Sequence, residues 1–167
     1  MTFWTNADAA SIHHPIDIIE EIVEANRWLF ERAHSDEMVV ELAGRWCHYR
    51  LFFVWQAEIS ALQFSCQFDL KVPPERRGAV LELLSAMNTK LWLGHFEVNA
   101  ADGAIIFRHA LLLRGARATN LSILEDMVEI ALTECERFYP ACQFVIWGGK
   151  SPDDAINAAM IDTAGQA

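Results

Sequence analysis

Apolar and polar residues alternate most regularly between Leu62 and Leu70. Successive side chains of an extended chain point to opposite sides, so this segment has one apolar and one polar side. Residues 37–42 and 48–56 alternate in the same way, although less strictly. Short connections join these three segments, and the pattern favours antiparallel strands with one covered face.

Helical spacing of apolar residues predicts three long helices and a short one. Pro15 opens the first helix, whose apolar stripe includes Ile22 and Leu29 and which we expect to end near residues 33–37. The other three helices are predicted within residues 72–90, 119–139 and 151–160. The signals for these three are an apolar stripe of Val80, Leu81, Leu84 and Met87 after Pro74, a cap at Thr119 or Asn120, and a cap at Ser151 before Pro152. The apolar run 144–147, after Pro140, is compatible with a strand or with a buried turn.

The stretch from Asn88 to His109 predicts a hairpin around the turn "NAADG", in which Gly103 can take a positive φ. The register that keeps apolar side chains together pairs Val98 with Ile105, Phe96 with Phe107 and His95 with Arg108. One face then carries Phe96, Val98, Ile105 and Phe107, and the other carries His95, Glu97, Ile106 and Arg108. A shift by one residue would mix the two faces, so the pattern disfavours it.

Together these segments predict an α+β fold. We expect an antiparallel five-stranded sheet with helices packed on one face, in the order α-β-β-β-α-β-β-α plus a short C-terminal helix. No repeat, low-complexity tract or linker divides the chain, so a single domain is predicted over residues 1–167. Residues 1–14 are expected to be flexible, and residues 161–167 are expected to form a tail.

The spacing His95-x-Glu97 also occurs in zinc enzymes, which makes a catalytic site the alternative to a plain hairpin face. Zinc deaminases need a downstream P-C-x-x-C, and "PACQF" from Pro140 departs from it. Residues two apart in a strand share a face, which explains the spacing without a metal. We therefore predict no catalytic, cofactor-binding or metal-ligating residue. A small enzyme with a pocket around His95, Glu97 and Arg108 remains the alternative.

Two other motifs lack parts of the sites that they resemble. "GGKS" ends like a phosphate-binding loop, but Phe144 stands where that loop needs its first glycine. His13 and His14 are adjacent, and adjacent positions of a helix or strand do not converge on one metal ion. We expect this pair to precede Pro15 on a flexible end. No G-x-S-x-G motif surrounds a serine.

The amino-acid composition indicates that the protein associates with another copy of itself or with a partner. The hydrophobic fraction is 53%, above the ~45–50% of typical soluble domains. Such a surplus is usually placed at a subunit interface or in a partner groove. The formal net charge of −10 argues against binding to nucleic acid or to anionic membrane surfaces.

The cysteines and the N-terminus favour the cytoplasm. Cys47, Cys66, Cys135 and Cys142 form no C-x-x-C pair and lie in apolar runs, so buried free thiols are predicted. The N-terminal residues lack the basic and apolar regions of a secretory signal. No apolar run approaches the ~18 residues of a membrane span.

The segment "AMNTKLWLGHFEVNAADGAIIFRHALLLRG" resembles the YbjN-domain family of bacterial proteins. The likeness includes the asparagine-bearing helix end and the strands "LGHFE" and "IIFRHALLL", and "FYPACQFVIWGGKSPDDAI" is similar to alphaproteobacterial members. The resemblance implies a fold similar to type III secretion chaperones, which are commonly homodimers that bind extended segments of other proteins. The family is described as a regulator of sensory or stress responses, and no catalytic residues carry over. The helix over 151–160 departs from the simple chaperone order.

The resemblance implies a non-enzymatic, chaperone-like or regulatory protein-binding domain of the bacterial cytoplasm. We expect a homodimer without a cofactor that binds a protein or peptide, and neither nucleic acid nor membrane. A structural subunit of a larger assembly is a further alternative. The second long helix and the strand over 92–98 are the candidate interface, because an unpaired strand edge invites pairing. The candidate interface residues are Leu84, Asn88, Leu91, Trp92, Leu93, His95, Glu97 and Arg108.

Overall fold

The computed structural model describes residues 14–114 and 121–164 of the 167-residue chain. One antiparallel sheet has the strand order β1-β2-β3-β4-β6-β5. Its strands are β1 (Leu29–His34), β2 (Glu37–Ala43), β3 (His48–Gln56), β4 (Ala61–Lys71), β5 (His95–Val98) and β6 (Ala104–Leu112). The α-helices are α1 (Pro15–Ala25), α2 (Arg77–Asn88), α3 (Leu121–Ile146) and α4 (Pro152–Ala164), with short 3-10 helices η1 (Ala57–Ile59) and η2 (Pro74–Arg76). The α+β class is confirmed, but the sheet has six strands rather than five.

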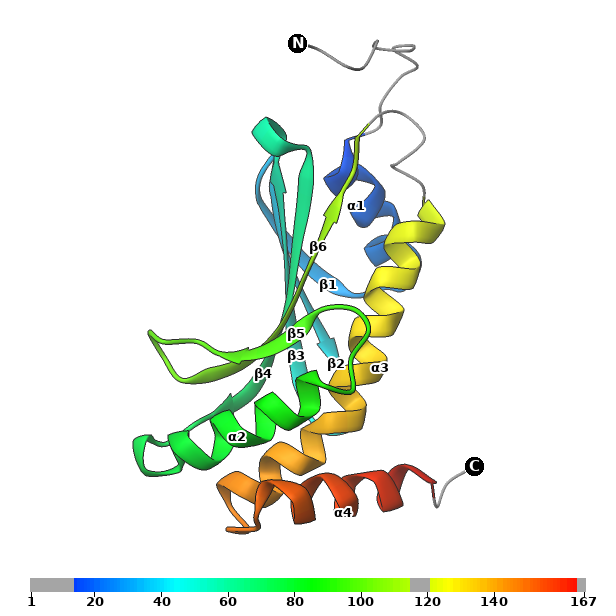
Figure 1. Ribbon diagram of the computed structural model, residues 1–167. Helices are drawn as coiled ribbons and strands as arrows, with labels where there is room; N and C mark the ends of the chain where they lie inside the picture. Colours follow the sequence, from blue (N-terminus) through cyan, green and yellow to red (C-terminus); the bar gives the residue numbers. More distant parts are fainter. Residues whose placement is uncertain (1–13, 115–120, 165–167) are drawn as a thin grey trace.

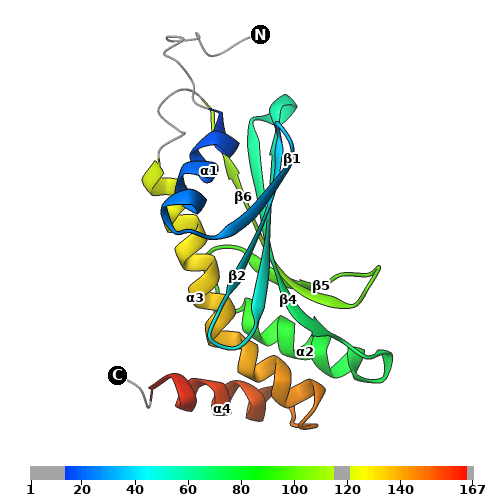
Figure 2. The same cartoon turned by 180° about the vertical axis from the view of Figure 1, so that it is seen from behind.

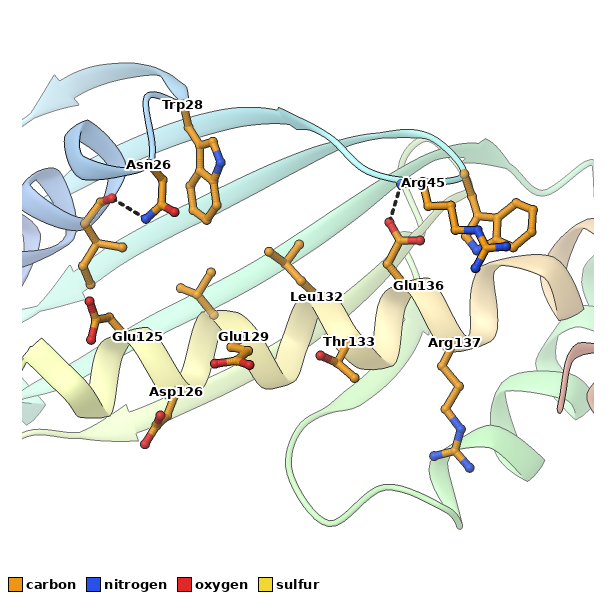
Figure 3. A pocket seen from close by; sticks show the side chains of 13 residues that line it. Asn26, Trp28, Arg45, Glu125, Asp126, Glu129, Leu132, Thr133, Glu136 and Arg137 are labelled. Carbon is orange, nitrogen blue, oxygen red and sulfur yellow. Dashed lines mark hydrogen bonds between the residues drawn. The ribbon is translucent and has the colours of Figure 1, made fainter. Parts of the chain in front are cut away.

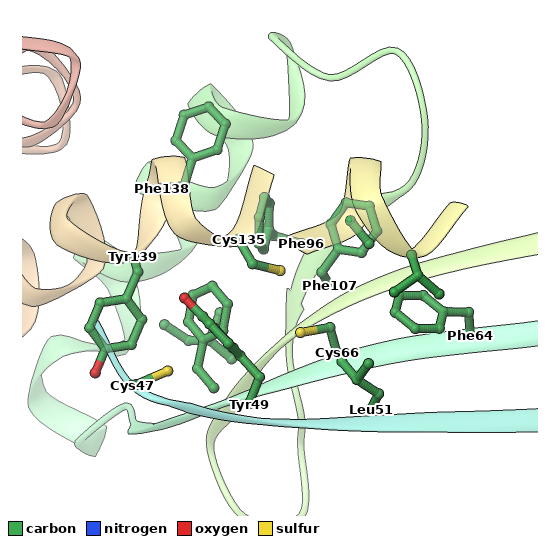
Figure 4. Packing of buried hydrophobic residues seen from close by; sticks show 14 of the residues in the cluster. Cys47, Tyr49, Leu51, Phe64, Cys66, Phe96, Phe107, Cys135, Phe138 and Tyr139 are labelled. Carbon is green, nitrogen blue, oxygen red and sulfur yellow. The ribbon is translucent and has the colours of Figure 1, made fainter. Parts of the chain in front are cut away.

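α3 extends along the sheet, with α1 near its first turns and with α2 and α4 near its last turns (Figure 1). β4 shows which face of the sheet the helices cover. Phe64 and Cys66 are buried beneath the helices, whereas Gln63 on the opposite face is exposed. Cys66 and Cys135 of α3 lie in the same packed layer as Phe96 and Phe107 (Figure 4). The alternation predicted for residues 62–70 is therefore confirmed, as is the burial of all four cysteines.

The sixth strand arises because the first helix is shorter than predicted. α1 ends at Ala25, and Arg27 takes a left-handed conformation with φ of 56°. The Trp28 N–H donates to the Val23 carbonyl over 3.1 Å, and the Arg27 N–H donates to the Glu24 carbonyl over 3.0 Å. These two hydrogen bonds form a Schellman motif, which ends many helices. The chain then continues as β1, in which Leu29 is 76% exposed instead of facing the core.

α3 is longer than predicted. It continues through Pro140 to Ile146, so residues 144–146 are neither strand nor buried turn but the end of this helix. Proline removes one backbone N–H from the helix. The helix persists here because Phe138, Cys142 and Val145, on both sides of Pro140, are fully buried in the core. The burial of these side chains offsets the missing hydrogen bond.

The predicted start of one helix needs correction, and the start of another is confirmed. Pro74 lies in η2, α2 begins only at Arg77, and its buried stripe includes Leu83 whereas Leu81 is exposed. Ser151 caps α4 as predicted, because its Oγ accepts from the Asp154 N–H over 3.3 Å. α4 itself continues into the predicted tail, to Ala164. The caps proposed at Thr119 and Asn120 lie outside the described residues.

His14 is not on a flexible end. Its Nδ1 accepts from the Ile16 N–H over 3.3 Å, and its Nε2 lies 2.9 Å from Asp36 Oδ1. His14 is thus the cap of α1, and Pro15 takes the first helical position as predicted. Residues 1–13, including His13, lie outside the described residues. Within the described ranges, no helix is long and apolar enough to span a membrane.

Candidate functional site

The hairpin of β5 and β6 has the register that the sequence predicts. His95 faces Arg108, Phe96 faces Phe107 and Val98 faces Ile105. The Phe96 and Phe107 rings meet edge to face with centroids 5.2 Å apart, and both side chains are buried. Gly103 has a φ of 75°, as the turn requires.

The polar face of this hairpin is a surface ion cluster. Glu97 Oε1 lies 2.9 Å from Arg108 Nη2, and Glu97 Oε2 lies 3.5 Å from His95 Nε2. The side chains of His95 and Arg108 are more than half exposed. Neither His95, Glu97 nor Arg108 lines the groove along α3 or the smaller hollow among β2, β3 and β4. Across the described ranges, no group of three or more His, Cys, Asp or Glu residues could hold a metal ion.

The outer edge of β5 is not open, although β5 is an edge strand as predicted. The Asn88 side chain, at the end of α2, donates from Nδ2 to the Phe96 carbonyl over 3.0 Å. Its Oδ1 accepts from the Phe96 N–H over 2.7 Å. The amide therefore occupies both outward-facing backbone groups of Phe96, which an added strand would otherwise use. β1 lies at the opposite edge of the sheet (Figure 2). Its side chains are mostly exposed.

The remaining candidate interface residues have different exposures. Leu84 is only 3% exposed and belongs to the core, so it has almost no surface for a partner. Leu91 is partly buried against the same core. Trp92 is 98% exposed, and Leu93 beside it is also exposed. An interface in this region would therefore be formed by the loop before β5 rather than by the strand edge.

A groove lies along α3, on the side that faces the end of α1 and the turn between β2 and β3 (Figure 3). Its volume is about 850 Å³. Its lining residues are Ile22, Asn26, Trp28, Arg45, Trp46, Glu125, Asp126, Val128, Glu129, Leu132, Thr133, Glu136 and Arg137. None of them is among the candidate residues that the sequence indicated, so the sequence analysis missed this site.

One end of the groove is formed by the Schellman motif at the end of α1. This motif places Trp28 directly after the left-handed Arg27, and the half-buried Trp28 indole lines the groove. Asn26 supports the same turn, since its Nδ2 donates to the Ile22 carbonyl over 2.8 Å. The signal for this end is weak in the sequence because glycine, the residue that most often takes this position, is replaced by arginine.

The other end is the turn between β2 and β3, which is held against α3. The Arg45 N–H donates to Glu136 Oε1 over 2.8 Å. A side chain at Gly44 would overlap the Tyr49 ring and the Glu136 carboxylate, so only glycine fits there. Glu136 Oε2 and the Tyr49 hydroxyl are both buried without a hydrogen-bond partner. Burial, followed by nearby Cys47 and Glu136, raises the pKa of Tyr49 above its ordinary value, so the hydroxyl stays neutral.

The groove combines an apolar floor with charged walls. Val128 is buried and Leu132 is partly buried beneath it. Glu125, Asp126 and Glu129 stand along α3 on the same stretch (Figure 3). A cleft of this size with apolar and aromatic lining and a few polar groups is typical of ligand-binding sites.

A second hollow of about 370 Å³ lies among residues of β2, β3 and β4. Its lining residues are Glu41, His48, Tyr49, Arg50, Gln67, Phe68 and Asp69. Two of its charged groups already have partners, because Arg50 is paired with Glu41 over 2.8 Å and Asp69 accepts from the Tyr139 hydroxyl over 2.8 Å. This hollow is smaller, and much of its polar lining is engaged, so the groove along α3 is the stronger candidate site.

Comparison with known proteins identifies the fold and the family. The sequence matches the YbjN family, described as "Putative bacterial sensory transduction regulator", over residues 15–144. The structure is similar to the crystal structure of "YbjN, a putative transcription regulator from E. coli", with a TM-score of 0.51 and 11% identity. That similarity covers 71% of this chain and 84% of the other. No curated protein matches the sequence.

Proposed function

Because the chain belongs to the YbjN family, we propose that it is a non-enzymatic regulatory protein of the bacterial cytoplasm that binds segments of other proteins. The observation that carries this proposal is the groove along α3. The family is described as a regulator rather than as an enzyme. The shape and lining of the groove support the proposed binding activity.

The groove is elongated, which suits a polypeptide segment better than a compact substrate. Its lining on α3 extends from Glu125 to Arg137. At ~1.5 Å of rise per residue, this part of α3 is about 18 Å long. Trp28 and Arg45 stand toward opposite ends (Figure 3). An extended segment advances ~3.3 Å per residue, so about five or six residues would fill this length.

The alternative, a small enzyme around His95, Glu97 and Arg108, has less support. These side chains form an exposed ion cluster and do not line either of the two hollows. Catalytic groups usually act in a cleft that excludes water, and none of the three is held in one.

The proposal is tested by site-specific photo-crosslinking in the native bacterium. A photoreactive residue at Thr133, an exposed groove position, should give discrete adducts with another protein, and these are identified by mass spectrometry. The matched control places the same residue at Glu82, an exposed position of α2 outside the groove. Equal adducts from the two positions, or none from Thr133, would contradict binding in the groove.

We also propose that the protein is a homodimer, with the exposed Trp92 and Leu93 at the contact. A fully exposed tryptophan followed by an exposed leucine forms an apolar surface that association would remove from water. Light scattering at micromolar concentration should give the mass of two chains, and Trp92→Ala should give the mass of one. A monomeric wild-type protein would contradict this proposal.

A further inference from the structure

Three carboxylates along the groove have no salt-bridge partner among the described residues. Glu125, Asp126 and Glu129 are exposed on α3, and no Lys, Arg or His of residues 14–114 or 121–164 forms a salt bridge with them. Glu136, farther along the groove, differs because it already accepts a backbone N–H. This stretch of the groove therefore presents negative charge that the described part of the chain does not compensate.

The two arginines that line the groove do not neutralise these carboxylates. The Arg45 guanidinium lies 4.6 Å from the centre of the Trp46 ring. The Arg137 guanidinium lies 5.0 Å from the centre of the Phe138 ring, and its Nη2 is 3.4 Å from Met160 Sδ. Both arginines belong to the end away from Glu125 (Figure 3). The groove thus has an acidic half beside Trp28 and a second half where both of its arginines lie.

Net charge also distinguishes between the polypeptides that could occupy the groove. A second copy of this chain carries a net charge of −10, and residues 1–13 contain Asp8 and no Lys or Arg. Neither has the net positive charge that would complement the acidic half. A partner with basic residues would gain both electrostatic attraction and burial against Trp28 and Leu132.

We propose that the occupant of the groove is a basic polypeptide segment of another protein. Its Lys or Arg side chains face Glu125, Asp126 and Glu129, and its bulky apolar side chains pack on Trp28 and Leu132. This inference rests on the proposed function, since it assigns the chemistry of the partner to the same groove. In an extended segment, basic residues at alternate positions are ~6.6 Å apart. That spacing is close to the ~6 Å between residues four apart on a helix, such as Glu125 and Glu129.

The test measures the binding of short fluorescent peptides to the full-length protein by anisotropy. Three peptides share the same apolar residues and carry Lys, Ser or Glu at the alternating positions. A fourth has the sequence of residues 1–13. The Lys peptide should bind about tenfold more tightly than the Ser peptide. Its affinity should fall severalfold as salt is raised, because exposed charges are screened. The Glu peptide should bind most weakly of the three.

Two double variants test whether the preference for the Lys peptide comes from the groove. Glu125→Lys with Glu129→Lys should weaken the Lys peptide about tenfold or more. Glu75→Lys with Glu82→Lys changes the net charge equally at exposed positions outside the groove and should change the affinity little. Equal weakening by the two pairs would overturn the proposal, because the attraction would then come from the net charge.

The outcomes separate this inference from the proposed function. If the Ser or Glu peptide, or the peptide of residues 1–13, binds in the groove at least as tightly as the Lys peptide, the basic partner is wrong while groove binding stands. If none of the four peptides binds, both the basic partner and the binding function are overturned.

Discussion

The hairpin of β5 and β6 and the groove along α3 are built in different ways. The hairpin is formed by neighbouring residues, and each face of it follows from alternation and one turn. The groove is assembled from three separate places, namely the end of α1 with the turn that follows it, the turn between β2 and β3, and α3. The residues whose spacing suggests a catalytic site lie on the hairpin. The groove, in contrast, has the size and lining that are typical of a binding site.

This difference shows that a suggestive spacing and a site are separate things. His95 and Glu97 are two apart because they share the outer face of a strand, where the His95 side chain is 52% exposed and the Glu97 side chain 33% exposed. Trp28 and Glu136 are 108 positions apart and share one groove. Both residues line this groove because of how the helix α1 ends and how a turn is held to α3. The following predictions test each half of this comparison, from the largest expected effect to the smallest.

The largest effect is expected from the inner face of the hairpin. Phe96→Ala or Phe107→Ala should lower the free energy of unfolding by about 3–5 kcal/mol, because each removes a buried ring. A domain has only ~5–15 kcal/mol in total. Denaturant unfolding measures the change, and insoluble protein would agree with it.

Glu97→Ala is the matched control on the outer face of the same strand. Its ion pair with Arg108 lies at the surface, and surface pairs contribute ~0–1 kcal/mol. If Glu97→Ala proved as damaging as Phe96→Ala, the hairpin's polar face would have a structural or functional role that its exposure does not indicate.

The second effect concerns the end of the groove. Gly44→Ala should destabilise the protein by about 1–3 kcal/mol, because the added methyl group overlaps the Tyr49 ring and the Glu136 carboxylate. The turn that carries Arg45 would move away from α3, so binding in the groove should weaken as well. Thermal unfolding and peptide anisotropy measure the two effects.

Gly78→Ala is the control for Gly44→Ala. Nothing lies within 4 Å of a side chain added at Gly78 in α2, so this change should be neutral or slightly stabilising. A Gly44→Ala protein with unchanged stability and binding would mean that the turn is not held where the structure places it.

Much of the fold could be predicted because its signals are local. β4 and the hairpin follow from alternation, and α4 follows from Ser151 and Pro152. The errors have physical reasons. Arg27 takes a left-handed conformation that usually indicates glycine, so the end of α1 was missed. Pro140 stays inside α3 because the flanking side chains are buried, which no local pattern shows.

The groove could not be predicted for a related reason. Its lining residues are ordinary in type, and only the tertiary structure gathers them. The same holds for the edge of β5. The register identifies an edge strand, but the sequence does not show that Asn88 reaches across to Phe96. The next prediction addresses this contact.

Asn88→Ala should destabilise the protein by about 1–2 kcal/mol, because it removes two hydrogen bonds to the Phe96 backbone. It should also expose the edge of β5 and increase self-association, which unpaired edges promote. Asn88→Asp keeps an acceptor for the Phe96 N–H and loses the donor to its carbonyl, so its effect should be intermediate. Unfolding and light scattering measure both changes. An Asn88→Ala protein with unchanged stability would show that water replaces the amide without penalty.

The smallest effect is expected from His109, which follows Arg108 on β6. Burial, followed by the charge of nearby His95, lowers the pKa of His109 below its ordinary value of 6.5. The unfolded chain therefore binds a proton more readily than the folded one, and stability falls as the pH falls below about 6.5. His109→Gln should reduce this loss on the acid side and leave stability at higher pH nearly unchanged. His34→Gln, at an exposed residue of β1, is the matched control and should leave the acid-side slope as it is in the wild type. Unfolding measured across this pH range tests the sign, because a slope that steepened in His109→Gln would mean that the folded protein favours the charged imidazole.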